Sequence, residues 1–310
     1  MNKPTQKIYR TTNWPAYNRA LMSRGNIAIW FDPATQWYAP SKGKQGRNQT
    51  YSDAAIQCCL MIKSLFRLSL RMVTGFVQSL IKLCGLNWIA PDYTTLCRRQ
   101  KHIDIVISYQ KSSDGLHLLM DSTGMKFLGE GEWKRKKHGP EYRRQWRKLH
   151  IGIDAKTLQI RAVQLTTNNV SDSQVLGDLL NQIPQDEQID SVYTDGAYDT
   201  KQCRQVIADR QGHAVIPPIK NAKPWKDTKS SSLERNELLR TVKRLGRTLW
   251  EKWSGYHRRS LVETKMHCIK LLGDKLMARS FPSQVNEIHA RVAVLNRFTE
   301  LGRPLTQVTP

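Results

Sequence analysis

The chain has 310 residues and a formal net charge of +23, from 49 lysines and arginines against 26 aspartates and glutamates. Such an excess of cations is typical of proteins that bind a polyanion, which makes nucleic acid the expected partner and an anionic membrane surface the second choice. The most apolar segment, residues 56–90, is interrupted by Lys63, Arg67, Arg71 and Lys82. These charges exclude a membrane-spanning helix there, so the composition indicates a soluble protein long enough for two domains.

The cysteines and the first residues bear on the cellular compartment. No two of the six cysteines form a C-x-x-C pair, which argues against a zinc site, and most of them stand beside apolar residues, as buried thiols do. Such thiols favour a reducing compartment. Residues 1–14 contain no apolar core of a secretory signal. We therefore expect a cytoplasmic protein.

Residues 1–50 form a basic N-terminal arm with little hydrophobic periodicity. Asn13-Trp14-Pro15 and Asp32-Pro33 are typical of turns. Residues 41–50 read SKGKQGRNQT, a basic loop that suits contact with a DNA backbone and equally suits a solvated, mobile segment. The sequence alone leaves these two interpretations open.

Residues 51–112 are expected to form an all-helical DNA-binding domain. Polar caps and a glycine stop predict three helices, over residues 53–66, 70–84 and 93–101. Three helices that end in a basic one resemble a helix-turn-helix unit, although a plain helical bundle fits the pattern as well. The candidate DNA contacts on the third helix are Arg98, Arg99 and Lys101.

After a linker at residues 108–115, short apolar runs alternate with helical segments. Residues 116–122 are typical of a buried strand that delivers Asp121 at its end, and residues 191–195 of another strand that ends at Asp195. The order is three strands, a helix, a strand, a helix and a strand, which is typical of an α/β domain. The remaining elements are expected over residues 149–154, 159–166, 172–182, 201–209 and 213–216.

Two segments of this domain are strongly basic. Residues 132–148 interleave aromatic residues with cations, which suits a nucleic-acid surface, although a disordered charged loop has the same composition. Residues 220–259 form a basic connection with 12 lysines and arginines against four acids. It contains three tryptophans whose roles stay open, Trp225, Trp250 and Trp253. The candidate DNA contacts of the first segment are Lys134, Arg135, Lys136, Lys137, Arg143, Arg144 and Arg147.

A helix that begins near Arg258 would carry an unusual polar face. A helix turns about 100° per residue, so Arg259, Glu263 and Lys270 fall within a sector of roughly 40°, with Tyr256 close to it. One interpretation is a basic surface helix with an Arg259–Glu263 ion pair. The other is a carboxylate that binds a metal ion, flanked by groups that contact phosphates.

Three acids then stand out, namely Asp121, Asp195 and Glu263. In so basic a protein, converging carboxylates require a cation between them. Magnesium accepts carboxylate oxygens and leaves positions for phosphate oxygens, and two such ions activate a hydroxyl and stabilise the leaving oxygen in phosphoryl transfer. Asp154, which ends a strand, and Asp199, four residues after Asp195, are weaker candidates for the same site.

With these residues in place, the chain resembles the DDE transposases of bacterial insertion sequences, in particular the IS5 family within a broader IS4-like group. The most specific feature is the signature Tyr-x2-Arg-x3-Glu-x6-Lys at Tyr256, Arg259, Glu263 and Lys270. The resemblance covers nearly the whole chain. The other matching motifs are Asn13-Trp14-Pro15-x-Tyr17-Asn18, Ile29-Trp30-Phe31-Asp32, Asp121-Ser122-Thr123 and Asp195-Gly196-Ala197-Tyr198-Asp199.

The resemblance implies a fold and a set of roles. The implied fold is an RNase H-like catalytic domain, a mixed five-stranded sheet flanked by helices, over residues 113–302, with a basic insertion at 219–255 and a tail at 303–310. The implied cofactor is Mg²⁺, with Mn²⁺ as a substitute and two ions bound. The implied metal ligands and catalytic residues are Asp121, Asp195 and Glu263, and the implied phosphate contacts are Tyr256, Arg259 and Lys270.

The resemblance also implies an activity and a setting. A transposase of this kind binds terminal inverted repeats, cleaves DNA at the ends of its element and joins the 3′-OH ends to target DNA. We therefore expect double-stranded DNA as the partner, a homodimer or higher oligomer on that DNA, and no membrane partner. The expected location is the bacterial cytoplasm, in association with the nucleoid.

Two other functions remain open, an inactive DNA-binding repressor form and a metal-dependent nuclease that cuts without joining. The three acids and the signature argue against the first, and a helical N-terminal region suited to end recognition argues against the second. Only about 68 positions separate Asp195 and Glu263. This spacing leaves little room for the large β insertion of some relatives, so formation of a hairpin intermediate is an open question.

Overall fold

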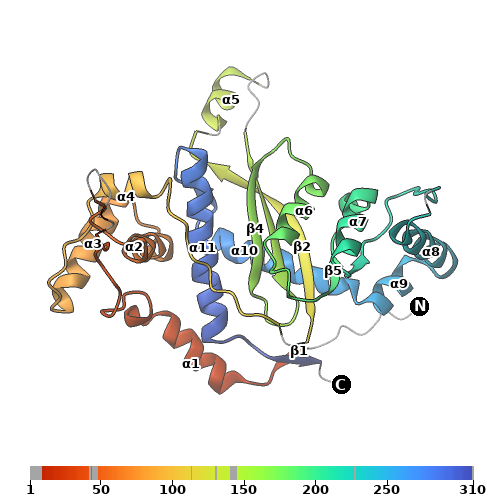
Figure 1. The fold of residues 1–310 in the computed structure, drawn as a ribbon, viewed down its shortest axis with the longest axis horizontal. Helices are drawn as coiled ribbons and strands as arrows, with labels where there is room; N and C mark the ends of the chain where they lie inside the picture. Colours follow the sequence, from red (N-terminus) through yellow and green to blue (C-terminus); the bar gives the residue numbers. More distant parts are fainter. Residues whose placement is uncertain are drawn as a thin grey trace. The chain divides into compact units, whose positions relative to one another are not determined.

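Two compact units, each with its own core, make up the chain (Figure 1). Unit 1 comprises Met1–Ser108 and Ala290–Pro310, and unit 2 comprises Tyr109–His289. Helix α11 (Phe281–Leu301) passes from unit 2 into unit 1, so residues 290–302 belong to unit 1 here, whereas the resemblance assigned them to the catalytic domain. The computed structural model describes residues 9–41, 43, 48–112, 114–129, 131–139, 145–226 and 228–308.

Unit 2 is built on a mixed sheet whose main strands follow the order β4-β3-β2-β5-β6. The central strand β2 runs antiparallel to β3 and parallel to β5, and a two-residue strand, β7, pairs with its far end. This sheet, flanked by helices, is compatible with the RNase H-like fold expected from the sequence. The strands are β2 (Leu116–Phe127), β3 (Arg147–Asp154), β4 (Ile160–Thr167), β5 (Ile189–Tyr193), β6 (His213–Val215) and β7 (Lys275–Leu276).

Strand β2 is longer than the sequence predicted. The apolar run ends at Met120, but the strand continues through a polar stretch to Phe127, which places Asp121 in its middle and not at its end. The reason is backbone pairing: β3 remains in register with β2 from Leu118 to Met125, and β7 pairs with the last two residues. Ladder hydrogen bonds hold an extended backbone whatever the side chains are, so hydrophobicity alone underestimates such a strand.

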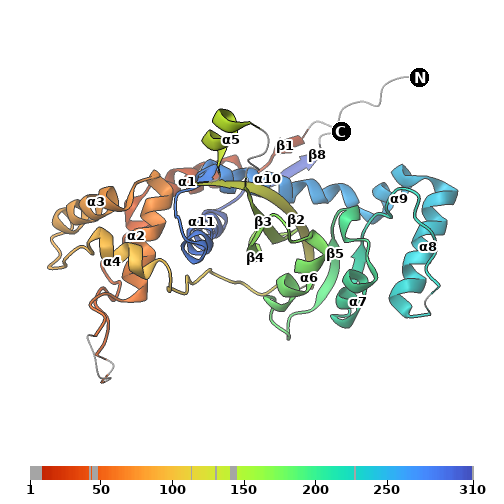
Figure 2. The same cartoon turned by 90° about the horizontal axis from the view of Figure 1, so that it is seen from above.

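The two faces of β2 are covered by different helices. Leu118 and Met120 are fully buried in the core that α6 and α7 close. Because side chains alternate along a strand, Asp121 and Thr123 point to the other face, which α10 covers. Figure 2 shows α10 on the opposite side of the strands from α6 and α7. The bounds are α6 (Asp172–Asn181), α7 (Lys201–Asp209) and α10 (Ser260–Leu271).

The basic connection between β6 and α10 is folded into two helices that the sequence did not predict. They are α8 (Ser230–Leu245) and α9 (Arg247–Ser254), followed by a 3-10 turn, η3 (Tyr256–Arg259). Helix α10 therefore begins at Ser260, slightly later than expected, and Tyr256 and Arg259 precede it. The buried face of α8 contains Ser231, Arg235 and Asn236, among others, so its pattern carries almost no apolar signal.

The three helices expected in the N-terminal unit are confirmed. Ser52, Ser69 and Asp92 cap their first turns through side-chain oxygens that accept backbone N–H groups. Only three residues separate the first two helices, whereas residues 84–92 separate the second from the third. The helices are α2 (Asp53–Phe66), α3 (Leu70–Leu83) and α4 (Tyr93–Arg99).

The N-terminal arm has more structure than predicted. The segment that was expected to turn at Trp14-Pro15 instead begins a helix, α1 (Trp14–Arg24), because a proline in the first turn needs no N–H partner and has a helical φ. A short 3-10 helix, η1 (Ile27–Ile29), follows, and the turn expected at Asp32-Pro33 is present. Strand β1 (Tyr9–Thr11) pairs with β8 (Thr306–Val308) within unit 1.

Candidate active site

Asp121 lies on the face of β2 that α10 covers. Its carboxylate accepts the N–H of Ser122 at 2.8 Å and forms an ion pair with the guanidinium of Arg259. Burial raises the pKa of the Asp121 carboxyl above its ordinary value, and the negative charge of Asp195 acts in the same direction, while Ser122 and Arg259 oppose it. The carboxyl is thus a partly desolvated group beside both a cation and a second acid.

Asp195 reaches the same level of the sheet from the neighbouring parallel strand. Leu119 of β2 is paired with Tyr193 of β5, and Asp121 and Asp195 each follow that pair by two residues. Adjacent strands lie about 5 Å apart, so the two aspartates meet at one point of the sheet. Asp195 also caps the short helix η2 (Gly196–Tyr198), because its side chain accepts the N–H of Ala197 at 2.9 Å.

Glu263, in the first turn of α10, is the third predicted acid, and Arg259 connects it to Asp121. The guanidinium of Arg259 donates to the Glu263 carboxylate at 2.8 Å and at the same time contacts Asp121, so one cation bridges two of the three predicted acids. Glu263 itself is more than half exposed. The Arg259–Glu263 ion pair of the first interpretation is present, and the same guanidinium also contacts the Asp121 carboxylate of β2. Metal binding by Glu263, the second interpretation, stays a prediction.

The other two residues of the signature lie on the same side of unit 2. Lys270, in the last turn of α10, donates to the Thr123 hydroxyl at 2.7 Å, two residues beyond Asp121. Tyr256 packs its ring against Trp250, with the centroids 5.4 Å apart, and burial raises the pKa of its phenol. Two of the four signature residues, Arg259 and Lys270, therefore contact β2 directly, while Tyr256 and Glu263 lie next to Arg259. The expected single helix face is instead divided between η3 and α10.

These side chains fit a divalent cation in their chemistry. Carboxylate oxygens are the ligands that magnesium prefers, and a cation already lies between two of the acids in the form of the Arg259 guanidinium. Within the described ranges, no three Asp, Glu, His or Cys side chains lie in a ready-made metal-binding group. The guanidinium of Arg259 now contacts Asp121 and Glu263, the two acids between which a bound cation would take its place.

The basic residues of segment 132–148 fall into two groups. Arg135, Lys136 and Lys137 lie exposed on α5 (Glu132–His138), a short helix between β2 and β3, and Lys137 stacks on Trp133 at 4.7 Å. Arg147 instead packs between the rings of Phe127 and Phe281 and donates to Gln284 at 2.8 Å, so it is tied into unit 2. The side chain of Lys134 and the residues Arg143 and Arg144 lie outside the described part of the chain.

The basic residues in and just after α4 differ in whether their side chains bind other groups of unit 1. Arg99 donates to the carbonyl of Tyr51 at 2.8 Å and pairs with Asp53, so it fastens α4 to the start of α2. Arg98 donates back to Thr94 in its own helix, and Lys101 lies exposed just beyond it. At least Arg99 is therefore used within unit 1.

Asp199 is a functional candidate whose role the sequence underestimated. Its carboxylate is fully buried and accepts from Arg204 of α7 and from Arg235 of α8, each at 2.9 Å. Arg235 also stacks on Trp225 at 4.4 Å and donates to the carbonyl of Lys223 at 2.6 Å. Asp199 therefore fastens the basic insertion to the segment that begins at Asp195. The sequence signal for Asp199 was its place four residues after Asp195, one of the three predicted acids.

A second buried polar cluster lies on the opposite face of β2. Asp172 contacts Lys148 at 2.9 Å and His150 at 3.4 Å. Although burial raises the pKa of Asp172, hydrogen bonds from His150, Ser122 and Lys148 outweigh it and hold the pKa well below its usual range. Asp172 was predicted only as the start of a helix, yet it anchors Ser122, the neighbour of Asp121.

Tyr198 lies within the electrostatic reach of both Asp172 and the predicted acids Asp121 and Asp195. Its ring is fully buried, and its hydroxyl has no hydrogen-bond partner among the residues the structure describes. Burial raises the pKa of the phenol, and the negative charges of Asp172, Asp121 and Asp195 raise it further. Tyr198 therefore stays neutral at physiological pH among three carboxylates.

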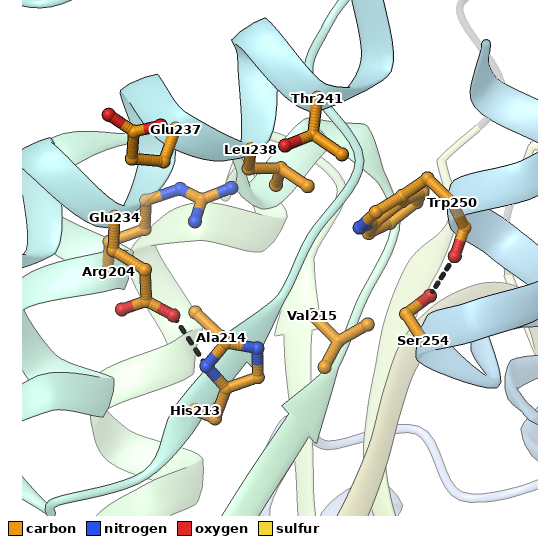
Figure 3. Close-up of a pocket in the computed structure, with 10 residues that line it drawn as sticks. All are labelled: Arg204, His213, Ala214, Val215, Glu234, Glu237, Leu238, Thr241, Trp250 and Ser254. Carbon is orange, nitrogen blue, oxygen red and sulfur yellow. Dashed lines mark hydrogen bonds and ion pairs between the residues drawn. The ribbon is translucent and has the colours of Figure 1, made fainter. Parts of the chain in front are cut away.

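A cavity of about 200 Å³ lies where the edge strand β6 meets α8 and α9 (Figure 3). Its walls include Arg204, Trp250 and an ion pair between His213 of β6 and Glu234 of α8, whose atoms are 2.5 Å apart. The hydrogen bond that His213 donates to the Glu234 carboxylate raises the pKa of His213 above 6.5, and the same bond lowers the pKa of Glu234 below 4.5. The pair therefore links the insertion to the sheet in a pH-dependent way.

We expect Glu234→Gln to lower the pKa of His213 towards 6.5, measured by NMR titration of the histidine ring protons. His213 has a raised folded pKa, so its contribution to stability is complete below pH 6.5 and is lost as the pH rises through the folded pKa. Glu234 has a lowered pKa, so its contribution is present above pH 4.5 and is lost below it. Glu237→Gln, at the same cavity, should leave the titration unchanged, and an unchanged titration in Glu234→Gln would contradict the link.

Comparison with known protein families shows which family the chain belongs to. Among the residues the structure describes, no helix is both long and apolar enough to cross a membrane. A family model described as a transposase DDE domain matches residues 112–297, which contain all three acids and the whole of the signature. A second model with the same description matches residues 22–130. The first match spans more than half of the chain, and the chain therefore belongs to the transposase DDE domain family.

Proposed function

We propose that this transposase binds the terminal inverted repeats of an insertion sequence of the IS5 family, cleaves DNA at the element ends and joins the 3′-OH ends to target DNA. The observation that carries the proposal is the arrangement of three acids from three elements. Asp121 and Asp195 follow one register pair of neighbouring parallel strands, and Glu263 meets Asp121 at the guanidinium of Arg259. Phosphoryl transfer needs little else from a protein than such positioned charge.

Asp121, Asp195 and Glu263 would hold magnesium, with manganese as a substitute, and two ions are proposed. Metal ions in such a site activate the attacking oxygen and neutralise the leaving one when bound. The chain contributes the alignment of the carboxylates: β2 holds Asp121, Asp195 is fixed just beyond β5 as the cap of η2, and Ser122, held by Asp172, supports the backbone beside Asp121. An acid whose backbone is already fixed costs less to order when the site assembles.

When DNA binds, the positively charged side chains of the signature would exchange their present partners in the protein for phosphates of the DNA. Arg259 offers two N–H edges that now contact Asp121 and Glu263, and a phosphate accepts the same fork. Lys270 and Tyr256 lie beside it and would contact phosphates near the element end. Release of Arg259 to a phosphate would free the acids for metal, so DNA binding and metal binding would support each other.

The basic segment between β2 and β3 would hold the DNA backbone. The exposed cations of α5, together with Lys134, Arg143 and Arg144, would contact the DNA backbone, and a homodimer or larger assembly would hold the two ends together. The protein would act in the bacterial cytoplasm at the nucleoid. A mass measured by light scattering on the DNA complex that fits a single chain would contradict the proposed assembly.

The proposal is tested with a labelled duplex that carries the element's terminal repeat, a supercoiled plasmid and purified protein, with and without Mg²⁺. We expect magnesium-dependent nicking at the repeat boundary and a joined plasmid product. Nicking without joining, even from pre-cut ends, would identify a nuclease instead. Binding without any nicking in Mg²⁺ or Mn²⁺ would identify an inactive DNA-binding form.

A further inference from the structure

Helix α3 presents a polar face to solvent in unit 1. One side of the helix is buried in the helical core through Val73, Val77, Leu80 and Ile81. The other side is exposed along the full 14 residues of the helix, about 21 Å. The exposed residues are Arg71, Met72, Gly75, Gln78, Ser79, Lys82 and Leu83.

Gly75 lies in the middle of this exposed face and has no role within unit 1 that requires glycine. Its backbone is helical, and a Cβ added there would meet no atom within 4 Å. Glycine in a helix interior is less favourable than alanine, so neither backbone conformation nor internal packing accounts for it. A close approach from outside the chain does account for it, because glycine is the residue that lets a partner reach the helix backbone.

The charge of the surroundings indicates which partner approaches. Between Asp53 and Asp92 the sequence has no acidic residue, while it has Lys63, Arg67, Arg71 and Lys82. Two of these cations, Arg71 and Lys82, lie near opposite ends of the exposed face, and Arg71 is held 4.3 Å over the ring of Tyr93. A face with cations at both ends and small or amide residues between them complements a duplex with phosphates on either side of a groove.

An open pocket lies along the exposed face of α3. It has a volume of about 480 Å³, is open to solvent, and is lined by Gly75, Gln78, Ser79, Lys82 and, from the segment after α3, Leu86 and Trp88. Its polar wall is the exposed side of α3. The open pocket leaves Gly75, Gln78 and Ser79 accessible to a partner that approaches α3 from solvent.

The connections within unit 1 favour α3 over α4 as the helix that reads DNA. A helix-turn-helix places a turn of three or four residues before its recognition helix. Here the three residues Arg67–Ser69 precede α3, with Arg67 at the turn in the left-handed conformation, φ 51°. By contrast, α4 has only seven residues and its Arg99 is bound to α2.

We infer that α3 lies in the major groove of the end duplex, with Gly75 at the closest approach, Gln78 and Ser79 at base edges, and Arg71 and Lys82 on flanking phosphates. This inference rests on the proposed recognition of element ends and assigns that recognition to one helix. An amide side chain at a base edge discriminates adenine through its donor and acceptor, and the flanking cations supply affinity without sequence preference.

The decisive variant is Gly75→Ala, because it separates stability from binding. The wild-type protein is first used to select its preferred duplex from a pool of random sequences, and binding is then measured by fluorescence anisotropy. We expect Gly75→Ala to raise the Tm of the protein by a few degrees and to weaken binding to the selected duplex by about tenfold or more. A change that only damaged the fold would lower the Tm.

Gly177→Ala is the matched control. Gly177 is also an interior helical glycine, in α6, and a Cβ there would first meet Val206 at 4.0 Å. We expect it to raise the Tm in the same way and to leave binding to the selected duplex unchanged. Equal binding by the two alanine variants would overturn the inference.

Two further variants identify what each position contributes. Lys82→Ala should weaken binding to the selected and to random duplexes by the same factor and reduce the slope of log K against log salt by about one. Gln78→Ala should relax selection at one base position. If Arg98→Ala on α4 relaxes selection and Gln78→Ala does not, α4 reads the DNA and the inference is wrong. If the wild type selects no sequence at all, end recognition itself fails, whereas intact selection with insensitive α3 variants refutes the inference alone.

Discussion

Asp121→Asn, Asp195→Asn and Glu263→Gln are each expected to reduce magnesium-dependent nicking of end DNA by about a thousand-fold or more. Each change keeps the shape of the side chain but removes one of the negative charges that a divalent cation requires. Binding of the end duplex should persist or strengthen slightly, because the change removes a negative charge near phosphates. The measurement pairs single-turnover nicking rates with anisotropy titrations on one labelled duplex.

Asp178→Asn is the matched control for these variants. Asp178 is an exposed carboxylate of α6 that contacts Gln164 at 3.2 Å, and it lies in the same unit but outside the three converging acids. Its nicking rate should stay within about twofold of the wild type, since surface changes of this kind cost little. Retained cleavage in all three site variants would refute the assignment of the acids, and loss of DNA binding together with cleavage would point to misfolding instead.

Two of the predicted acids could be picked out from the sequence because each follows a short, mostly buried run. Leu116 to Met120 is apolar apart from His117, and the second run ends in the apolar pair Val192-Tyr193, although Asp190 and Ser191 precede that pair. The register between them could not be read from composition. It is set by long-range pairing of β2 with β5 across about 70 residues, and this pairing, seen in the structure, brings Asp121 and Asp195 to one level.

The sequence did not predict helix α8 or the contact of Arg259 with Asp121, because both depend on tertiary contacts. The buried face of α8 is polar because Arg235 and Asn236 bond to partners that are distant in sequence, namely Asp199 and the backbone of Trp225. A hydrophobic pattern cannot reveal a helix held this way. The signature spacing did place Arg259 beside Glu263, but its second contact, with Asp121, depends on where η3 meets β2 and is a tertiary feature.

Asp199→Asn is expected to lower the stability of unit 2 strongly. The Asp199 carboxylate is the buried counter-charge of two guanidinium groups, Arg204 and Arg235, and all three side chains are at most 2% exposed. Removal of one member of a buried ion pair costs about 3–5 kcal/mol, because the remaining charge stays desolvated without a partner. The measurement is urea unfolding followed by tryptophan fluorescence, to which Trp225, stacked on Arg235, contributes with the other eight tryptophans of the chain.

The control for this stability test is Glu237→Gln on the exposed side of the same helix. Glu237 pairs with Arg240, and both side chains are about two-thirds exposed, so the expected change in the free energy of unfolding is at most about 0.5 kcal/mol. The double variant Asp199→Asn with Arg235→Met should cost less than the sum of the two single changes, because it removes one of the two stranded charges along with its partner. A cost below about 1 kcal/mol for Asp199→Asn would mean that the insertion is held mainly by other contacts. A large cost together with weaker end-DNA binding would mean that the anchor of α8 also keeps Tyr256 and Arg259 in position for DNA.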